Sequence, residues 1–258
     1  MTRFNVEVYR RHKVTLKSFY LYPPDVWERF YRWSRSIESS LPPEVEINTI
    51  MYRDESISRE GPIVSMLATA YADSEQHARD VLSVFETCPV RDRALVSEVG
   101  VPTTLGELTS FGTAAHYPRA KRFIADNMWT HASFDDLQPG LKSIQAAFPP
   151  APSHMVWFPW TLAPPRPSMA YSVEDELYIA LYCAWDDAAD DEKYTNFVTE
   201  RMRAMEPVST GIQLADENLI NRPRHFVTDE SFRRLDRIRA EFDPDGLFVS
   251  WLRRPAMG

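Results

Sequence analysis

Histidine and carboxylate side chains are the first candidates for chemistry in this chain of 258 residues. The six histidines are scattered, with no H-x-x-x-H or H-E-x-x-H spacing, so no two can share one helix face as a helical zinc site requires. We expect solvated or structural roles for them. The carboxylates at Asp186-Asp187 and Asp190-Asp191-Glu192 stand between an expected strand and an expected helix. Acidic residues favour a helix N-terminus, so we predict a cap rather than a metal site.

Glycines exclude two further kinds of site. The chain has eight, and none falls into G-x-G-x-x-G or G-x-x-x-x-G-K-[ST] spacing. Phosphate loops need such glycines because bare backbone must come close to the anion. We therefore expect neither a dinucleotide nor a nucleoside triphosphate to be held by those loops.

Aromatic residues are more suggestive of a binding site. On a strand expected at 175–184, alternation places the phenols of Tyr178 and Tyr182 on one face and a helix-packed apolar surface on the other. Trp157 belongs to a second aromatic-rich strand expected at 153–160. Two interpretations stay open, an aromatic core and a face that lines an aromatic-rich pocket.

Composition narrows the class of protein. The net charge is −8 without a basic stripe, which argues against a nucleic-acid surface. No run of 18 apolar residues exists, and the N-terminus lacks the apolar core of a signal peptide, so we predict a cytoplasmic protein without membrane contact. Cys88 and Cys183 have no neighbouring cysteine, which fits a reducing compartment.

The first hundred residues predict a ferredoxin-like arrangement. Apolar periodicity indicates a strand, a helix, two strands, a helix that Ser74 caps, and a short strand. The expected ranges are 14–22, 24–39, 45–53, 62–72, the segment after Ser74, and 93–99. The fold class is therefore α+β, an antiparallel sheet with helices on one face, and the opposite face is open to a ligand or a second domain.

Secondary-structure signals are weak in segment 100–152 and clear again in the last third of the chain. Segment 100–152 shows only a helix at 134–148, capped by Ser133 and interrupted or kinked at Pro139-Gly140. Strands are expected at 153–160, 175–184 and 208–215, and helices at about 189–205 and 229–242. No repeat or linker separates these parts, so we predict one domain over 1–258.

The C-terminal segment carries a family resemblance. Residues 232–248, FRRLDRIRAEFDPDGLF, resemble the R-L-x-x-[IL]-[RK]-x-x-[YF]-D-P-x-x-[LV]-F ending of FAD-linked oxidases of the berberine bridge enzyme type, in the vanillyl-alcohol oxidase superfamily. The resemblance implies a substrate-binding (cap) domain, with the berberine bridge-like segment at about 205–252. It also implies that FAD is held mainly by an N-terminal domain that this chain lacks or by a partner.

The resemblance does not supply a catalytic residue. Where the family carries Tyr and Asn before the final helix, this chain reads GIQLADEN at 211–218, so no catalytic base is carried over. Gln213 can hydrogen-bond a ligand but cannot act as a base near neutral pH. The candidate substrate-binding residues are Tyr178, Tyr182, Trp157 and Gln213.

These observations leave two main functional hypotheses. The first is the substrate-binding part of a flavin-dependent oxidoreductase that oxidises a small organic alcohol or amine, working with a separate FAD-binding domain or subunit. The alternative is a cofactor-free binding protein, or a cyclase, isomerase or hydrolase on the same scaffold. A homodimer would then be the simplest cover for the open sheet face. A purely structural role has no specific support in the sequence.

Overall fold

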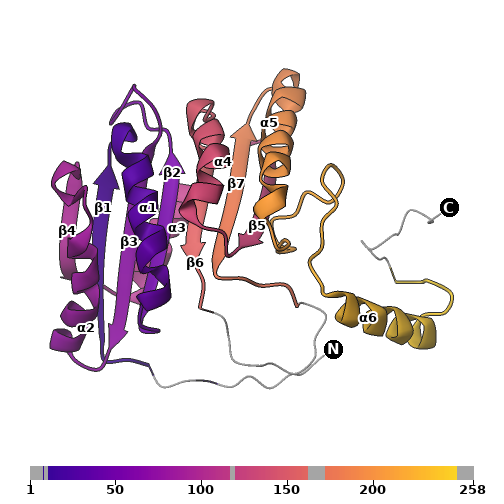
Figure 1. Ribbon diagram of the computed structural model, residues 1–258, viewed down its shortest axis with the longest axis horizontal. Helices are drawn as coiled ribbons and strands as arrows, with labels where there is room; N and C mark the ends of the chain where they lie inside the picture. Colours follow the sequence, from indigo (N-terminus) through magenta and orange to yellow (C-terminus); the bar gives the residue numbers. More distant parts are fainter. Residues whose placement is uncertain (1–7, 9–10, 117–119, 162–171, 249–258) are drawn as a thin grey trace.

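Seven strands form one antiparallel sheet in the order β4-β1-β3-β2-β6-β7-β5 (Figure 1). The computed structural model describes residue 8 and residues 11–116, 120–161 and 172–248, without the side chains of 111–116. The strands are β1 (Val14–Tyr22), β2 (Val45–Tyr52), β3 (Ile63–Ala72), β4 (Val96–Pro102), β5 (Arg122–Thr130), β6 (His154–Pro159) and β7 (Leu177–Trp185). The first four strands have the ferredoxin-like order, and the pairing of β2 with β6 continues the sheet into the second half.

Helices cover one face of this sheet (Figure 1). They are α1 (Trp27–Ile37), α2 (Glu75–Leu82), α4 (Phe134–Ala146) and α5 (Asp191–Ala204). The main hydrophobic core lies between them and the sheet and takes every second strand residue, for example Leu177, Ile179 and Leu181 of β7. Helix α3 (Leu105–His116) lies beside the opposite face, and α6 (Asp229–Phe242) extends away from the sheet (Figure 1). The predicted α+β class with an antiparallel sheet and helices on one face is confirmed.

Several local predictions are confirmed at the level of single hydrogen bonds. The Ser74 and Ser133 hydroxyls accept hydrogen bonds from the backbone at the starts of α2 and α4. Asp187 accepts one from the Ala189 amide, so this part of the acidic cluster caps a helical turn as expected. Cys88 and Cys183 are free and buried.

Other predictions are wrong. Strand β5 and helix α3 fall in segment 100–152, where the sequence predicted neither. The strand expected at 208–215 is reduced to an isolated bridge between Trp129 and Gly211. Of the two alternatives expected at Pro139-Gly140, interruption of the helix is wrong, because α4 runs through both residues. Gly140 serves a different purpose, because a Cβ at this position would lie 2.5 Å from Cγ of Met205 at the end of α5.

The segment that replaces the expected strand covers the outer edge of β5. An uncovered edge strand would expose unpaired backbone groups. Here the Trp129 amide donates to the Gly211 carbonyl at 2.8 Å, and the Trp129 carbonyl accepts from the Thr210 amide at 2.9 Å. The Asn127 carbonyl accepts from Nη2 of Arg222 at 2.7 Å. Three backbone groups of the edge are thereby satisfied by residues 210–222.

A buried ion pair fixes the same segment. The side chains of Asp126 and Arg222 are each 1% exposed, and Nε of Arg222 donates to Oδ2 of Asp126 at 2.8 Å, with a second bond from Nη2 to Oδ1. The side-chain Nδ2 of Asn218 donates to Oδ2 of the same carboxylate at 3.1 Å. Two charges removed from water are tolerated only when each finds the other in good geometry. The pair therefore ties residues 218–222 to the last strand of the sheet.

We predict that Asp126→Asn lowers the free energy of unfolding by roughly 3 kcal/mol, because it leaves the Arg222 charge buried without its partner. Urea denaturation measures this loss. The double variant Asp126→Leu with Arg222→Met should recover most of it. As a control, Arg32→Gln breaks an exposed ion pair with Asp135 and should lower the free energy of unfolding far less than Asp126→Asn does. Equal stabilities of wild type and Asp126→Asn would contradict the assignment.

A second buried ionisable side chain, that of Glu38, directly follows α1. The side chain of Glu38 is 3% exposed, and it accepts hydrogen bonds from Nε1 of Trp157 at 2.7 Å and Nη1 of Arg35 at 2.8 Å. Burial raises the pKa of Glu38 from 4.5 to about 7 despite these donors. The folded protein therefore keeps this proton to a higher pH than the unfolded chain does.

This difference predicts a pH-dependent stability. The contribution of Glu38 is fully present below pH 4.5 and is lost as the pH rises towards about 7. Relative to Glu38→Gln, the wild type should lose about 3 kcal/mol of unfolding free energy over this range. Urea denaturation of both proteins across the range measures the difference. Parallel stability profiles would show that Glu38 titrates normally.

Candidate functional site

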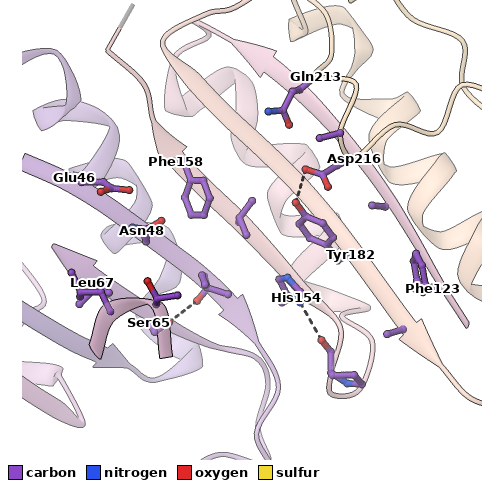
Figure 2. A pocket seen from close by; sticks show the side chains of 18 of the residues that line it. Glu46, Asn48, Ser65, Leu67, Phe123, His154, Phe158, Tyr182, Gln213 and Asp216 are labelled. Carbon is purple, nitrogen blue, oxygen red and sulfur yellow. Dashed lines mark hydrogen bonds between the residues drawn. The ribbon is translucent and has the colours of Figure 1, made fainter. Parts of the chain in front are cut away.

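The open face of the sheet carries a groove with a volume of about 1210 Å³. Helix α3 borders it through Leu105 and Leu108, and the turn 213–217 borders it on the side of β5 and β7. Strands β1, β2, β3, β5, β6 and β7 contribute the floor. Figure 2 shows polar side chains such as Asn48 and His154 and aromatic side chains such as Phe158 and Tyr182 on this floor. The structure thus places a concave surface on the face that the helices leave uncovered, and such concave surfaces are where small ligands bind.

The turn 213–217 reaches the groove because Asn127 holds it there. Asn127 is fully buried, and its Nδ2 donates to the carbonyls of Gln213 and Asp216 at 2.8 Å each. Its Oδ1 accepts from the Gln213 amide at 2.7 Å. Gly211 lets the chain enter the turn, since its φ is +154° and a Cβ would lie 2.6 Å from the His225 carbonyl oxygen.

Asp216 is the centre of the polar part of the groove. Its Oδ2 accepts hydrogen bonds from the hydroxyls of Tyr178 at 2.7 Å and Tyr182 at 2.8 Å (Figure 2 shows the second). Bonds from a hydroxyl to an ionised oxygen are stronger than bonds between neutral groups. Burial is the first cause that raises the pKa of Tyr178, and the neighbouring Tyr182 and Asp216 add to it, so this phenol stays protonated and donates.

His154 lies next to this cluster on β6. Its ring stacks on that of Tyr182 with centroids 4.6 Å apart, and Nδ1 lies 3.1 Å from the Pro152 carbonyl. A carbonyl can only accept, so the proton of the neutral ring is on Nδ1 and the lone pair is on Nε2. Burial lowers the pKa of His154, which keeps the ring neutral near neutral pH. The neutral imidazole can accept a proton or a hydrogen bond from a ligand.

The structure divides the four candidate residues predicted from the sequence. Tyr182 and Gln213 line the groove, and Tyr178 lies beneath them, 6% exposed and bonded to Asp216. Trp157 points to the other face, where its ring packs 4.9 Å from that of Tyr31. Alternation explains the separation, because Trp157 follows Met155 on the helix-covered side of β6 and His154 shares the open side with Val156 and Phe158.

Two groove residues escaped the sequence prediction for different reasons. His154 had a usable signal, since strand alternation places it opposite Trp157. Asp216 had none, because its position depends on hydrogen bonds to Asn127, Tyr178 and Tyr182, which are 34 to 89 residues away.

Two further observations concern other kinds of site. Among the described residues, no three His, Cys, Asp or Glu side chains gather where they could hold a metal ion. In the same part of the chain, every helix is too short or too polar to cross a membrane.

We predict a measurable coupling between Asp216 and Tyr182. In a double-mutant cycle of Asp216→Asn with Tyr182→Phe, the two losses of unfolding free energy should deviate from additivity by about 1–2 kcal/mol, because either change removes the same charge-assisted hydrogen bond. Urea denaturation of the four proteins gives the value. Tyr71→Phe is a suitable control, since the Tyr71 hydroxyl bonds to Glu46 instead, and it should be additive with Asp216→Asn. A coupling near zero for the Tyr182 pair would disprove the contact.

Comparisons with known proteins agree with this architecture. No protein-family model matches the chain. The FAD-linked oxidoreductase nodO of Hypoxylon pulicicidum is 24% identical over 242 residues, which are 90% of this chain and 51% of the relative. The chain therefore spans about half the length of this relative.

Solved structures show the same fold. The 6-hydroxy-D-nicotine oxidase of Arthrobacter nicotinovorans superposes with a TM-score of 0.71 at 14% identity, covering 93% of this chain and 54% of that one. The BBE-like 1 protein of Physcomitrella patens gives a TM-score of 0.66 at 13% identity, covering 92% and 53%. The chain is thus similar in sequence to about half of a FAD-linked oxidoreductase, and it shares its fold with about half of each of these two solved structures.

Proposed function

We propose that this chain forms the substrate-binding part of a flavin-dependent oxidoreductase, and that the groove on the open sheet face receives a small organic alcohol or amine. The observation that carries the proposal is the groove itself, about 1210 Å³ in volume, with Tyr182, Asp216 and His154 converging on it. Pockets that combine apolar walls with a few converging polar groups are typical of small-molecule sites.

The groove fits the ring part of a flavin better than its diphosphate. Glu46, Asp216 and Glu217 line it, and none of its described residues is Lys or Arg. A diphosphate would meet like charges without a compensating cation or glycine-rich loop. Aromatic and neutral polar groups such as Phe158, Asn48 and Tyr182 can contact an uncharged ring system (Figure 2). We infer that the diphosphate end of FAD is held by another domain or subunit.

The chemistry assigned to this chain is substrate binding and proton acceptance. A bound flavin supplies the hydride acceptor for oxidation of the carbon that bears the hydroxyl or amine. The substrate must also lose the proton of that hydroxyl or amine. Asp216 and Nε2 of His154 are acceptors on the groove wall, and Tyr182 orients Asp216 through its hydrogen bond. Apolar floor residues such as Val156 and Phe158 can contact the carbon skeleton of the substrate.

Helix α6 supports the proposal of a partner. Its first turn packs through Phe232 against the small cluster of Ile212, Phe226 and Val227. Beyond this turn Leu235 is half-buried, whereas Ile238 and Phe242 are 43% and 73% exposed. A helix of 14 residues gains little stability alone in water and needs its apolar side packed. Because nodO is about twice as long as this chain, we assign this surface to the FAD-binding domain or subunit.

The proposal predicts a yellow complex. Co-expression with a FAD-binding protein encoded beside this chain should give a complex that elutes together and carries the visible absorption of oxidised flavin. Replacing Ile238 and Phe242 with Glu should weaken the complex at least about tenfold, since it puts charges into an apolar interface. Ile220→Glu changes a residue that is 95% exposed outside α6 and should have no effect.

Two outcomes would contradict the proposal. If the chain binds no FAD-binding protein but forms a dimer through α6, the apolar side of α6 is an interface with a second copy of the chain. A flavin-free chain that converts its ligand would favour the cofactor-free cyclase, isomerase or hydrolase. Either result is visible in the same chromatography and absorption experiment.

A further inference from the structure

We propose that the groove is specific for substrates with a basic nitrogen, and that Asp216 is the residue that recognises the cationic amine. The inference rests on the proposed function and narrows its substrate from an alcohol or amine to an amine. The hydrogen bonds of Asp216, the charges of the groove and the apolar surface beside them support it.

The two oxygens of Asp216 are used differently. Oδ2 accepts from both Tyr178 and Tyr182, which fills its hydrogen-bonding capacity. Oδ1 has no hydrogen-bond donor or cation among the described residues. The carboxylate is half-buried on the groove wall, and the backbone on either side of it is fixed by Asn127. One oxygen is therefore held in place by the protein and the other is presented to a ligand.

The charges around Asp216 favour a cation. Apart from the phenols of Tyr71 and Tyr182 and the thiol of Cys183, the other ionisable groups of the described lining are Glu46, Glu217 and His154. The two glutamates add negative charge, and the imidazole is neutral for the reason given above. A protonated amine would be the first cation in the groove, whereas a carboxylate or phosphate would meet repulsion alone. An alcohol would gain a hydrogen bond but no charge pairing.

The surface beside Asp216 fits the rest of such a ligand. Ala125 of β5 pairs with Tyr182, and Phe123, two residues earlier, shares this face. Phe123 is 79% exposed, which is unusual for an aromatic side chain on a strand. Val156 and Phe158 continue the apolar surface across β6 (Figure 2 labels Phe158). The ligand that these groups recognise is an amine attached to an apolar or aromatic skeleton.

Proton balance is consistent with an amine substrate. The amine binds as a cation and must lose one proton to Asp216 before its carbon can lose a hydride. The ion pair then becomes a neutral carboxylic acid and a neutral amine. A flavin held by the proposed partner would supply the hydride acceptor, and the neutral amine would then be released as an iminium. No further oxidant or co-reactant is required for this half-reaction.

The test compares three probes with one skeleton on the chain in solution, phenylpropylamine, phenylpropanol and phenylpropanoate. We expect the amine to bind at least about tenfold more tightly than the alcohol, and the acid to bind most weakly, by isothermal titration calorimetry near neutral pH. Asp216→Asn keeps an acceptor for the phenols but removes the charge, so it should reduce the preference for the amine to near onefold. Glu46→Gln is the matched control, because it removes one negative charge from the β2 side of the same groove.

Each remaining outcome overturns the inference. These are equal affinities for amine and alcohol in the wild type, tighter binding of the acid, no binding of any probe, and an effect of Glu46→Gln equal to that of Asp216→Asn. The wild-type comparison of amine and alcohol does not depend on how a variant folds. Tight binding of the alcohol with no preference for the amine would refute the cation specificity while leaving the groove as the substrate site. Loss of the flavin complex would refute the proposed function instead.

Discussion

The candidate site depends on how the chain covers the outer edge of β5. This strand ends the sheet, so its backbone groups need partners, and Asp126 on it is buried and needs a counter-charge. Arg222 meets both needs, because it pairs with Asp126 and donates to the Asn127 carbonyl. Residues 211–217 lead up to this anchor, bridge Trp129 at Gly211, and are held at the border of the open face by Asn127. The groove wall is therefore a consequence of satisfying an edge strand.

Strand alternation then gives the two faces of the sheet different roles. The helix side is apolar except for isolated buried groups such as Glu38, whose donors Trp157 and Arg35 come from β6 and α1. The open side carries phenols, an imidazole and carboxylates, and none of the described groove residues is Lys or Arg. One face supplies stability, and the other supplies a surface whose polar groups are held in place by hydrogen bonds from neighbouring elements.

The sequence predicted correctly those helices and strands whose apolar pattern and capping residues lie within the element itself. Helices α1, α2, α4, α5 and α6 and most strands follow apolar periodicity, and caps such as Ser133 are visible as single residues. Strand β5 was missed because Asp126-Asn127 interrupts its apolar pattern. Their burial is explained by Arg222 and Asn218, which are more than 90 residues away. The strand expected at 208–215 failed for the related reason that these residues satisfy the edge with a bridge and side chains instead of a ladder.

The residues of the candidate site were also predictable only where local sequence patterns determine their positions. Tyr182 follows from alternation alone, whereas Trp157 was grouped with it by residue type although it lies on the other face. Asp216 could not be predicted, because a polar turn has no period and takes its place from contacts with distant strands.

The most direct test of the central claim is a crystal structure of the chain with bound phenylpropylamine. The account predicts the turn 213–217 on the open face, with Asp216 bonded to both phenols and the ligand nitrogen within hydrogen-bond distance of its other carboxylate oxygen. A turn that lies off the sheet, or an amine bound away from Asp216, would contradict it.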